Sequence, residues 1–170
     1  MPHVHIRPAT AEDADTILGF VHALAIYDGA PERVVATAED LRRDGLGEGA
    51  WFEALIAELG GAPVGYALFY PTYTAWEGRP GLFLEDAFLA EEARGKGIGR
   101  RVMAALAAIA LARGWTRIDL RVRADNRARA FYDDIGMGPL EGWISYKLSG
   151  PPLAALAAEA PAGAAAAFTR

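Results

Sequence analysis

The chain has 170 residues, 52% of them hydrophobic, with a formal net charge of −5 at pH 7 and no cysteine. This length predicts one domain with enough apolar residues for a buried core, and the acidic balance argues against a large nucleic-acid-binding surface. The lack of cysteine excludes disulfides, zinc–thiolate sites and a cysteine nucleophile.

The N-terminal part predicts a strand, two helices and a hairpin. The strand ends at Pro8, and the pairs Thr10/Asp13 and Thr37/Asp40 then resemble capping boxes, with Asp in place of Glu. In chain order, the predicted elements are a strand at 5–7, helices at 11–27 and 38–45, and strands at 52–58 and 64–70 joined by a turn at Gly60-Gly61.

The central and C-terminal parts alternate strands with helices, after a loop at 71–81 that is rich in aromatic residues. The further elements are a strand at 82–89, a helix at 98–113, a strand at 117–123, a helix at 126–135 and a strand at 143–148. This order predicts a mixed α/β (α+β) fold over residues 1–149, followed by an Ala- and Pro-rich tail over 150–170.

No targeting or membrane segment is expected. The first five residues contain no apolar run, which argues against a signal peptide. The apolar stretch at 104–112 is too short to span a bilayer and reads as a buried helix. We therefore expect a cytoplasmic protein without membrane partners.

The glycine-rich string Arg94-Gly95-Lys96-Gly97-Ile98-Gly99 stands between a predicted strand and a long predicted helix. Glycine lets backbone N–H groups approach a ligand closely, and a helix N-terminus favours negative charge. A P-loop string is absent, and Arg100 holds a position where the dinucleotide fingerprint needs glycine. The remaining pattern, R-x-x-G-x-G, predicts a phosphate or pyrophosphate ligand; the alternative is a glycine-rich helix entry with solvated cations.

Two acids and a tyrosine are candidates for proton transfer. Glu85 and Asp86 lie at the centre of a predicted strand, where strict alternation would place them on opposite faces of the sheet. One of them can accept the proton of an ammonium, directly or through water; the alternative is a salt-bridged surface acid. Tyr132 can protonate a departing thiolate, since thiol and phenol pKa values lie within ~2 units; the alternative is a core tyrosine beside Phe131.

The sequence motifs and their order along the chain resemble the GCN5-related N-acetyltransferase (GNAT) superfamily, and within it the diamine (spermidine/spermine) N1-acetyltransferase branch. The resemblance spans residues 5–148. The matching strings are Ile6-Arg7-Pro8-Ala9-Thr10, Asp40-Leu41 with Asp44-Gly45, Phe69-Tyr70, Thr72-Tyr73 with Trp76, Leu84-Glu85-Asp86 with Phe88, Arg94 through Gly99, Asn126, Phe131-Tyr132 and Glu141-Gly142-Trp143. It implies a mostly antiparallel twisted sheet of six to seven strands with about four helices.

The resemblance also implies direct transfer from acetyl-coenzyme A (acetyl-CoA) to an amine in a ternary complex, by a homodimer without a metal. Tyr132 would be the general acid and Glu85 the water-assisted base. The implied donor-binding residues are Ala87, Phe88, Leu89, Arg94, Gly95, Lys96, Gly97, Ile98, Gly99, Arg100 and Asn126. The implied acceptor-binding residues are Tyr27, Asp28, Trp76, Glu85, Asp86, Glu141 and Trp143, aromatics and acids that suit a cation.

The chain departs from the family pattern at two positions. Thr74 stands where the branch commonly has an acid, which should weaken recognition of a long polyamine. Asn126 stands six places before Tyr132, where the family usually has seven. We therefore expect an N-acetyltransferase for a small cationic amine, a di- or polyamine or a lysine-like amino acid. The alternatives are an aminoglycoside-like or protein amine as acceptor, or a non-catalytic acyl-CoA sensor.

Overall fold

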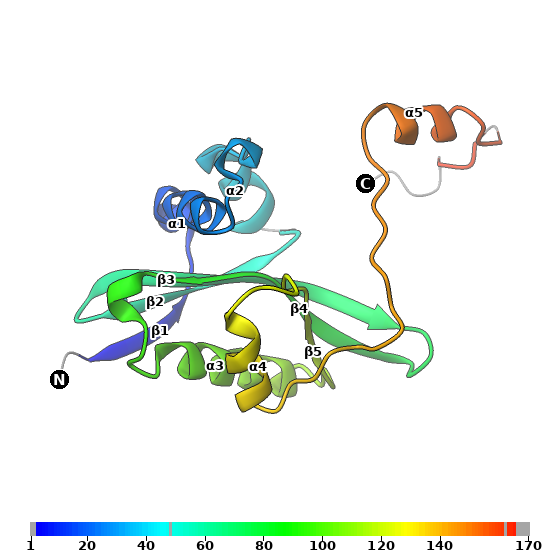
Figure 1. Cartoon of the computed structure of the whole chain (residues 1–170). Helices are drawn as coiled ribbons and strands as arrows, with labels where there is room; N and C mark the ends of the chain where they lie inside the picture. The colour runs from blue at the N-terminus through cyan, green and yellow to red at the C-terminus, as the bar shows by residue number, and fades with distance from the viewer. Residues whose placement is uncertain (1–2, 48, 162, 166–170) are drawn as a thin grey trace. The chain divides into compact units, whose positions relative to one another are not determined.

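A five-stranded mixed sheet organises the fold in the computed structural model, which describes residues 3–47, 49–161 and 163–165 (Figure 1). The strands follow one another in chain order, and all neighbours are antiparallel except β4 and β5, which are parallel. The strands are β1 Val4–Pro8, β2 Glu53–Leu59, β3 Ala62–Thr74, β4 Arg79–Leu89 and β5 Ile118–Leu120. The predicted mixed, mostly antiparallel α/β fold is confirmed, with five strands in the described residues where six to seven were expected.

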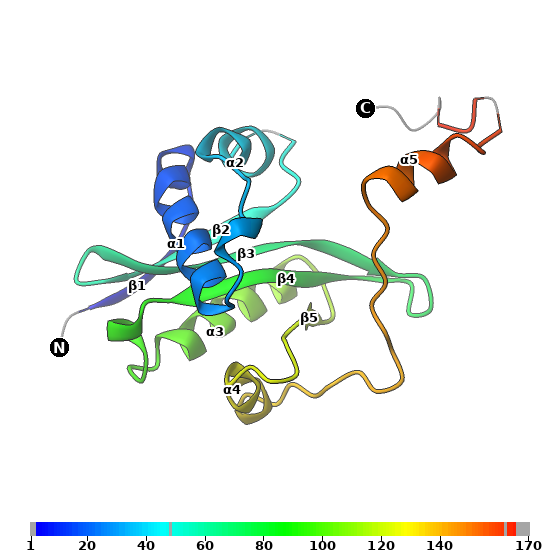
Figure 2. The same ribbon diagram turned by 45° about the horizontal axis from the view of Figure 1, so that its top comes forward.

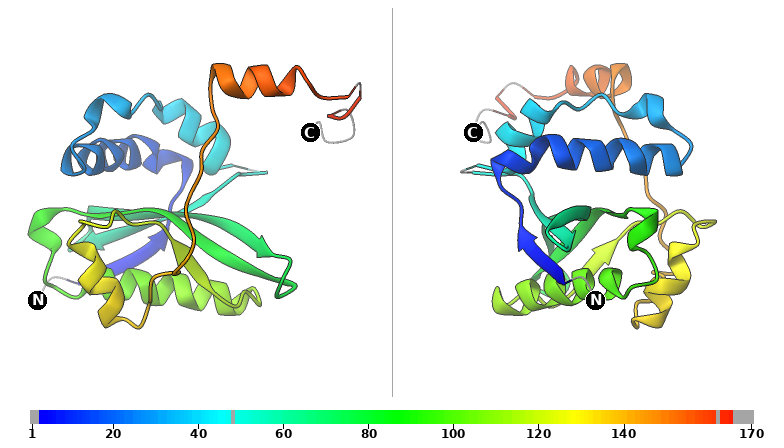
Figure 3. Two further views of the ribbon diagram at one scale, coloured as in Figure 1. Left: turned by 45° about the vertical axis from the view of Figure 1, so that its right-hand side comes forward. Right: turned by 90° about the vertical axis from the view of Figure 1, so that its left-hand side faces the viewer.

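Helices cover both faces of the sheet. Figures 1 and 3 show α1 (Ala14–Tyr27) and α2 (Ala38–Gly45) over one face and α3 (Ile98–Ala112) under the other. The first face is closed by buried apolar residues of α1, α2, β2 and β3: Ala14, Ile17, Leu41, Ala54, Ile56, Tyr66 and Leu68. On the opposite side, α3 buries Ile98, Val102, Met103, Leu106 and Ala110. Burial of these stripes from water is the main force that holds the layers together.

The remaining helices are short. They are α4 Ala128–Asp134, α5 Pro151–Ala157, and the 3₁₀ turns η1 Ala11–Asp13, η2 Pro31–Arg33 and η3 Glu91–Ala93. The chain divides into two compact units, Met1–Phe131 and Tyr132–Arg170, each described by itself. In the described residues, no helix is both long and apolar enough to cross a membrane.

Local signals placed the first helices correctly. Both predicted capping boxes are present, Thr10 with Asp13 before α1 and Thr37 with Asp40 before α2. The predicted turn at Gly60-Gly61 joins β2 to β3, with φ of 63° and 85°. Two successive positive φ values are typical of a type I′ hairpin, which glycine adopts without strain.

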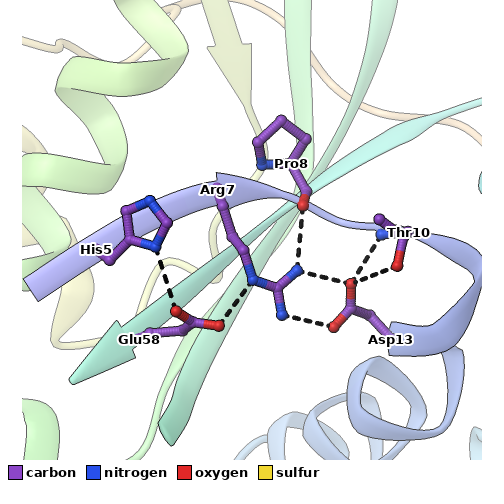
Figure 4. Close-up of polar contacts among 6 residues, drawn as sticks. All are labelled: His5, Arg7, Pro8, Thr10, Asp13 and Glu58. Carbon is purple, nitrogen blue, oxygen red and sulfur yellow. Dashed lines mark hydrogen bonds and ion pairs between the residues drawn. The ribbon is translucent and has the colours of Figure 1, made fainter. Parts of the chain in front are cut away.

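The β1–β2 end of the sheet is fastened to η1 by one arginine (Figure 4). The Arg7 guanidinium donates to both Asp13 carboxylate oxygens at 2.8 Å, and its Nε donates to Glu58 at 2.7 Å. Asp13 also accepts from the Thr10 backbone N–H at 2.8 Å. The hydrogen bond from Arg7, which outweighs the cost of burial, lowers the pKa of Asp13 to about 2.

The predicted loop at 71–81 is mostly strand, and that prediction was wrong. β3 continues to Thr74 and β4 begins at Arg79, which makes the long hairpin of Figure 2. In this hairpin, Pro71 lies opposite Leu82 and Pro80 lies opposite Tyr73. Leu82 N–H donates toward β5, to Arg117 C=O, and Thr116 N–H donates to Pro80 C=O. Pro71 and Pro80 therefore belong to non-hydrogen-bonded residue pairs of the β3–β4 ladder. Proline is tolerated at such positions because its missing N–H would not have bonded the other strand.

A β-bulge interrupts β4 at Glu85. Leu68 pairs with Asp86 and the next residue, Phe69, pairs with Leu84, so Glu85 is an extra residue without a partner in β3. A bulge adds one residue to one strand and shifts its side-chain alternation. The side chains on the two sides of Glu85 therefore do not follow one uninterrupted period of two.

Two predicted strands are shortened or missing. The strand expected at 117–123 is reduced to Ile118–Leu120, and the strand expected at 143–148 is not formed. An extended segment becomes a strand only when another strand pairs with it, and the described residues of Tyr132–Arg170 include none. The helix predicted at 126–135 is confirmed as α4, and the tail contains α5.

Candidate active site

The glycine loop forms an open backbone cradle at the N-terminus of α3. Gly95 and Gly97 have φ of 72° and 74°, a conformation that side chains other than glycine rarely adopt. A Cβ atom at either position would meet nothing within 4 Å, so backbone conformation and not packing requires glycine there. The first-turn N–H groups of a helix lack intrahelical acceptors, and the first turn of α3 contains no acid. These properties fit a bound anion.

Gly99 differs from the other two glycines of the loop, because its backbone has no positive φ. A Cβ atom there would lie 3.5 Å from the Phe131 ring and 3.6 Å from a Leu89 methyl group, which are ordinary van der Waals distances. Neither backbone conformation nor packing therefore requires glycine at this position. The exposed Lys96 and Arg100 provide positive charge near the loop.

Arg94 contacts the C-terminal end of α1 as well as the loop. Its Nε donates to Leu89 C=O at 3.0 Å. Its guanidinium lies over two rings, 5.2 Å from the centroid of Tyr27 and 5.8 Å from that of Phe88. Such cation–π contacts orient the guanidinium. Arg94 therefore links the predicted acceptor residue Tyr27 to the predicted donor residues Phe88 and Leu89.

The second half of β4 presents an open edge. β5 pairs with β4 only at Leu82–Leu84. Ala90 N–H donates to Val64 C=O, toward β3. Since antiparallel residues alternate in direction, the backbone groups of Ala87 and Leu89 point away from β3, to the edge beyond β5. Backbone groups on such an edge can pair with another extended chain that contains amides.

Glu85 and Asp86 lie on one face of the sheet, and the expectation that they face opposite sides was wrong. Tyr66 OH donates to Asp86 at 3.3 Å, and Tyr70 OH donates to Glu85 at 2.9 Å. Tyr66 and Tyr70 are four residues apart in β3 and so share a face. The bulge at Glu85 supplies the extra residue that brings both carboxylates to this face.

The paired acids create a negative region. Burial raises the pKa of Asp86, and the charges of Glu85 and Asp28 raise it further, while the Tyr66 hydrogen bond lowers it. Burial also raises the pKa of Tyr70, and the Glu85 carboxylate that accepts its hydrogen bond adds to the effect. A cation placed between the carboxylates would relieve their repulsion, because an opposite charge favours the ionised form.

Arg121 approaches the same carboxylate and was not among the predicted site residues. Its Nη2 lies 3.3 and 3.4 Å from the two Glu85 oxygens, and its guanidinium lies 5.2 Å from the Phe83 ring centroid. The sequence did show arginines and an acid alternating at 117–123, but this pattern alone did not indicate which arginine faces the acids.

A cleft of about 280 Å³ brings together three predicted residues, Tyr27, Asp28 and Asn126. Arg123, Asp125 and Arg127 complete its lining. Asn126 Oδ1 accepts from Ala128 N–H at 2.9 Å, which caps α4 and leaves the amide NH₂ group as a donor. The cleft therefore places Asn126, a predicted donor-binding residue, beside Tyr27 and Asp28, two predicted acceptor-binding residues.

The other predicted residues lie elsewhere. Trp76 is in the β3–β4 turn and is 87% exposed. Tyr132 is in α4, where burial raises its pKa. Tyr132, Glu141 and Trp143 belong to the second unit, and Trp143 is exposed. No group of three or more His, Cys, Asp or Glu residues is arranged for a metal in the part of the chain that the structure describes.

Residues 48–137 match the Acetyltransferase (GNAT) family. The chain belongs to the GNAT family. It is 36% identical over 169 residues to the thialysine N-epsilon-acetyltransferase of Bos taurus, covering 92% of this chain and 99% of that one. It is 31% identical over 160 residues to the spermidine/spermine N(1)-acetyltransferase-like protein 1 of Homo sapiens, covering 88% and 23%. This GNAT chain is accordingly an N-acetyltransferase.

The fold of this GNAT chain is also found in solved structures. An integron cassette protein from the mobile metagenome of V. cholerae superposes with a TM-score of 0.75 at 26% identity. The match covers 91% of this chain and 97% of that chain.

Proposed function

We propose that this N-acetyltransferase transfers the acetyl group of acetyl-CoA to the primary amine of a small cationic acceptor, lysine-like or diamine. The observation that carries the proposal is the pair of carboxylates, Glu85 and Asp86, on one face of β4 beside an open strand edge and a glycine cradle. The names of the relatives in Bos taurus and Homo sapiens support an acceptor of this class.

The donor would lie along the β4 edge and end at the cradle. Gly95–Arg100 would hold the pyrophosphate through backbone N–H groups and the positive end of α3. The open-edge groups of Ala87 and Leu89 would pair with the amides of the pantetheine arm, and one N–H would polarise the thioester carbonyl. Asn126 would contribute its free amide NH₂ group.

Direct transfer in a ternary complex accounts for the residues in the site. An alkylamine arrives as an ammonium, with a pKa near ~10, so a proton must leave before attack. Glu85 would accept that proton through water, and the amine nitrogen would form a bond to the acetyl carbon as the C–S bond breaks. Tyr132 would then protonate the departing thiolate, and the second proton that leaves the amine nitrogen as the amide forms would return the phenolate to its neutral form.

The acceptor would be held by charge and aromatic surface. Asp86 and Asp28 supply the negative region, and Tyr27 stands beside it at the end of α1. Trp76, Glu141 and Trp143 complete the proposed set. We further propose a homodimer, which light scattering during gel filtration would test; a mass equal to one chain would contradict it.

A coenzyme A-release assay over diamines, polyamines, lysine analogues and aminoglycosides tests the proposal. We expect release with lysine analogues and short diamines, because both present a primary ammonium on a flexible stem. Donor hydrolysis without an amine is the baseline. No amine-dependent release over this panel would contradict the proposal, and release with aminoglycosides alone would move the acceptor to another class.

The role of Tyr132 has its own test. Tyr132→Phe removes the proton donor and keeps the ring, so kcat should fall by roughly a hundredfold while acetyl-CoA affinity stays the same. Turnover gives the first quantity and calorimetry the second. The exposed Tyr146→Phe is the matched control. Wild-type turnover in Tyr132→Phe would remove the assigned role.

A further inference from the structure

Arg121 stands beside the proposed base because of strand pairing. β5 pairs in parallel with β4 so that Leu120 lies opposite Leu84. The residues that follow this pair are Glu85 in β4 and Arg121 directly after the end of β5, and Arg121 Nη2 lies 3.3 Å from Glu85 Oε2. The Arg121 side chain remains 61% exposed. It is a cation at the acceptor side of the site and is accessible to a ligand.

Its neighbouring arginines are already engaged by closer acids. Arg117 donates to Asp119 at 2.6 Å, and Arg123 donates to both Asp125 oxygens at 3.0 and 2.9 Å. In the described residues, the polar contacts of Arg121 are the longer ones from Nη2 to Glu85, which also accepts from Tyr70, and its guanidinium also lies over the Phe83 ring. A guanidinium offers five N–H donors, so the Nε and Nη1 donors of Arg121 remain for a second carboxylate.

We propose that Arg121 is a specificity-determining residue that binds a carboxylate of the acceptor. The inference rests on the proposed function and narrows it to an amino acid whose side chain ends in an amine. The planar fork of arginine matches a carboxylate bidentately, which an ammonium does not. A diamine or polyamine brings a second cation to this position and is repelled.

The spacing along β4 agrees with such an acceptor. The amine must reach the open edge at Ala87, and the carboxylate must reach the guanidinium beside Glu85. Two residues of strand span roughly 6 Å. The four-carbon stem of a lysine-like side chain covers a similar length.

The test compares L-lysine with 1,5-diaminopentane, which differ only by the α-carboxylate. The 170-residue chain is assayed for amine-dependent coenzyme A release, and the ratio of kcat/KM for the two amines is the readout. Arg121→Gln should lower this ratio by about tenfold, the lower range for a lost charge-assisted hydrogen bond at an exposed site. The KM for acetyl-CoA should not change.

Two further variants distinguish carboxylate binding by Arg121 from a general effect of lost positive charge or of lost folding. Arg121→Lys keeps a cation and should restore part of the ratio. Arg43→Gln removes the same charge from α2, where Arg43 pairs with Asp40 and Asp44, and should keep the wild-type ratio. Coenzyme A release with an unchanged ratio in Arg121→Gln would overturn the assignment of Arg121 alone. No release by the wild-type chain with either amine would overturn this inference, whereas the proposed function is overturned only if the whole amine panel gives no release.

Discussion

Asp86 is the residue at which stability and function conflict. Its side chain is partly buried and its carboxylate faces Glu85, and the hydrogen bond from Tyr66 OH offsets only part of the cost of the charge. Buried groups with raised pKa values occur frequently in active sites, where the charge is used. Removal of this charge should therefore stabilise the fold, and this effect can be measured without knowing the acceptor.

Asp86→Asn should be more thermostable than the wild type at pH 7. A raised acid pKa in the folded state means that stability is lost as pH rises above the ordinary value of 3.8, and the amide avoids this loss. The difference in Tm should therefore vanish at pH values below 3.8. Melting curves between pH 3 and 7.5 measure it, and a lower Tm for Asp86→Asn at pH 7 would contradict the prediction.

Asp125→Asn is the matched control for that series. The Arg123 hydrogen bond lowers the pKa of Asp125, so its charge is favoured in the folded chain. Removal of this charge should not raise the Tm. A rise of equal size in both variants would point to a general effect of net charge.

The faces of Glu85 and Asp86 could not be read from the sequence. Alternation is a local rule, and it places neighbouring residues on opposite faces only where the strand is uninterrupted. The bulge arises where the β3–β4 register shifts between Leu68 and Phe69, which depends on pairing with a distant segment. The residue types were recognised from the sequence, and their geometry was set by a contact that is not local. Arg121 was overlooked for the same reason.

Among the elements, the join between β1, β2 and η1 depends on the Arg7 network (Figure 4). Because the pKa of Asp13 falls from 3.8 to about 2, its contribution to stability is complete above pH 3.8 and is lost toward pH 2. Asp13→Asn should therefore lower the free energy of unfolding at pH 7 by about 2 kcal/mol. Urea unfolding at pH 7 and pH 2 measures this, and an equal loss at both values would contradict the ionic origin.

The α3 N-terminus allows a controlled test of the cradle. Gly97 and Gly114 flank the two ends of α3 with φ of 74° and 69°, and a Cβ atom at either would meet nothing within 4 Å. Alanine at each site should therefore cost a similar 1–2 kcal/mol or so in backbone strain. Only Gly97→Ala should weaken acetyl-CoA binding, by about tenfold in calorimetry. Equal affinity in the two variants would place the donor elsewhere.

Elements with local signals were predicted well. The two capping boxes and the Gly60-Gly61 turn involve residues within a few positions of one another. The long β3–β4 hairpin was missed because Pro71 and Pro80 indicate a break, although both occupy positions where no inter-strand N–H is needed. The direction of each backbone N–H depends on the pairing register, which the sequence does not show directly.

At the scale of the whole molecule, we propose that the catalytic domain ends near Ser149. In its described residues, the tail contains α5 and exposed alanines, with Leu153 and Leu156 as its large apolar side chains, both exposed. A chain ending at Ser149 should keep its Tm and keep turnover within about twofold of the full chain, as expected for a peripheral terminus. Thermal melting and the coenzyme A-release assay measure the two quantities. Aggregation or loss of turnover would show that the tail belongs to the domain.

The bulge in β4 determines which kinds of genetic change can alter the site. A substitution at Glu85 or Asp86 removes a carboxylate but cannot move it to the other face of the sheet. Deletion of a single codon there would restore regular pairing and turn one side chain to the opposite face. Amino-acid substitutions therefore leave the side chains at positions 85 and 86 on the same face of the sheet. A single insertion or deletion in β4 would place them on different faces.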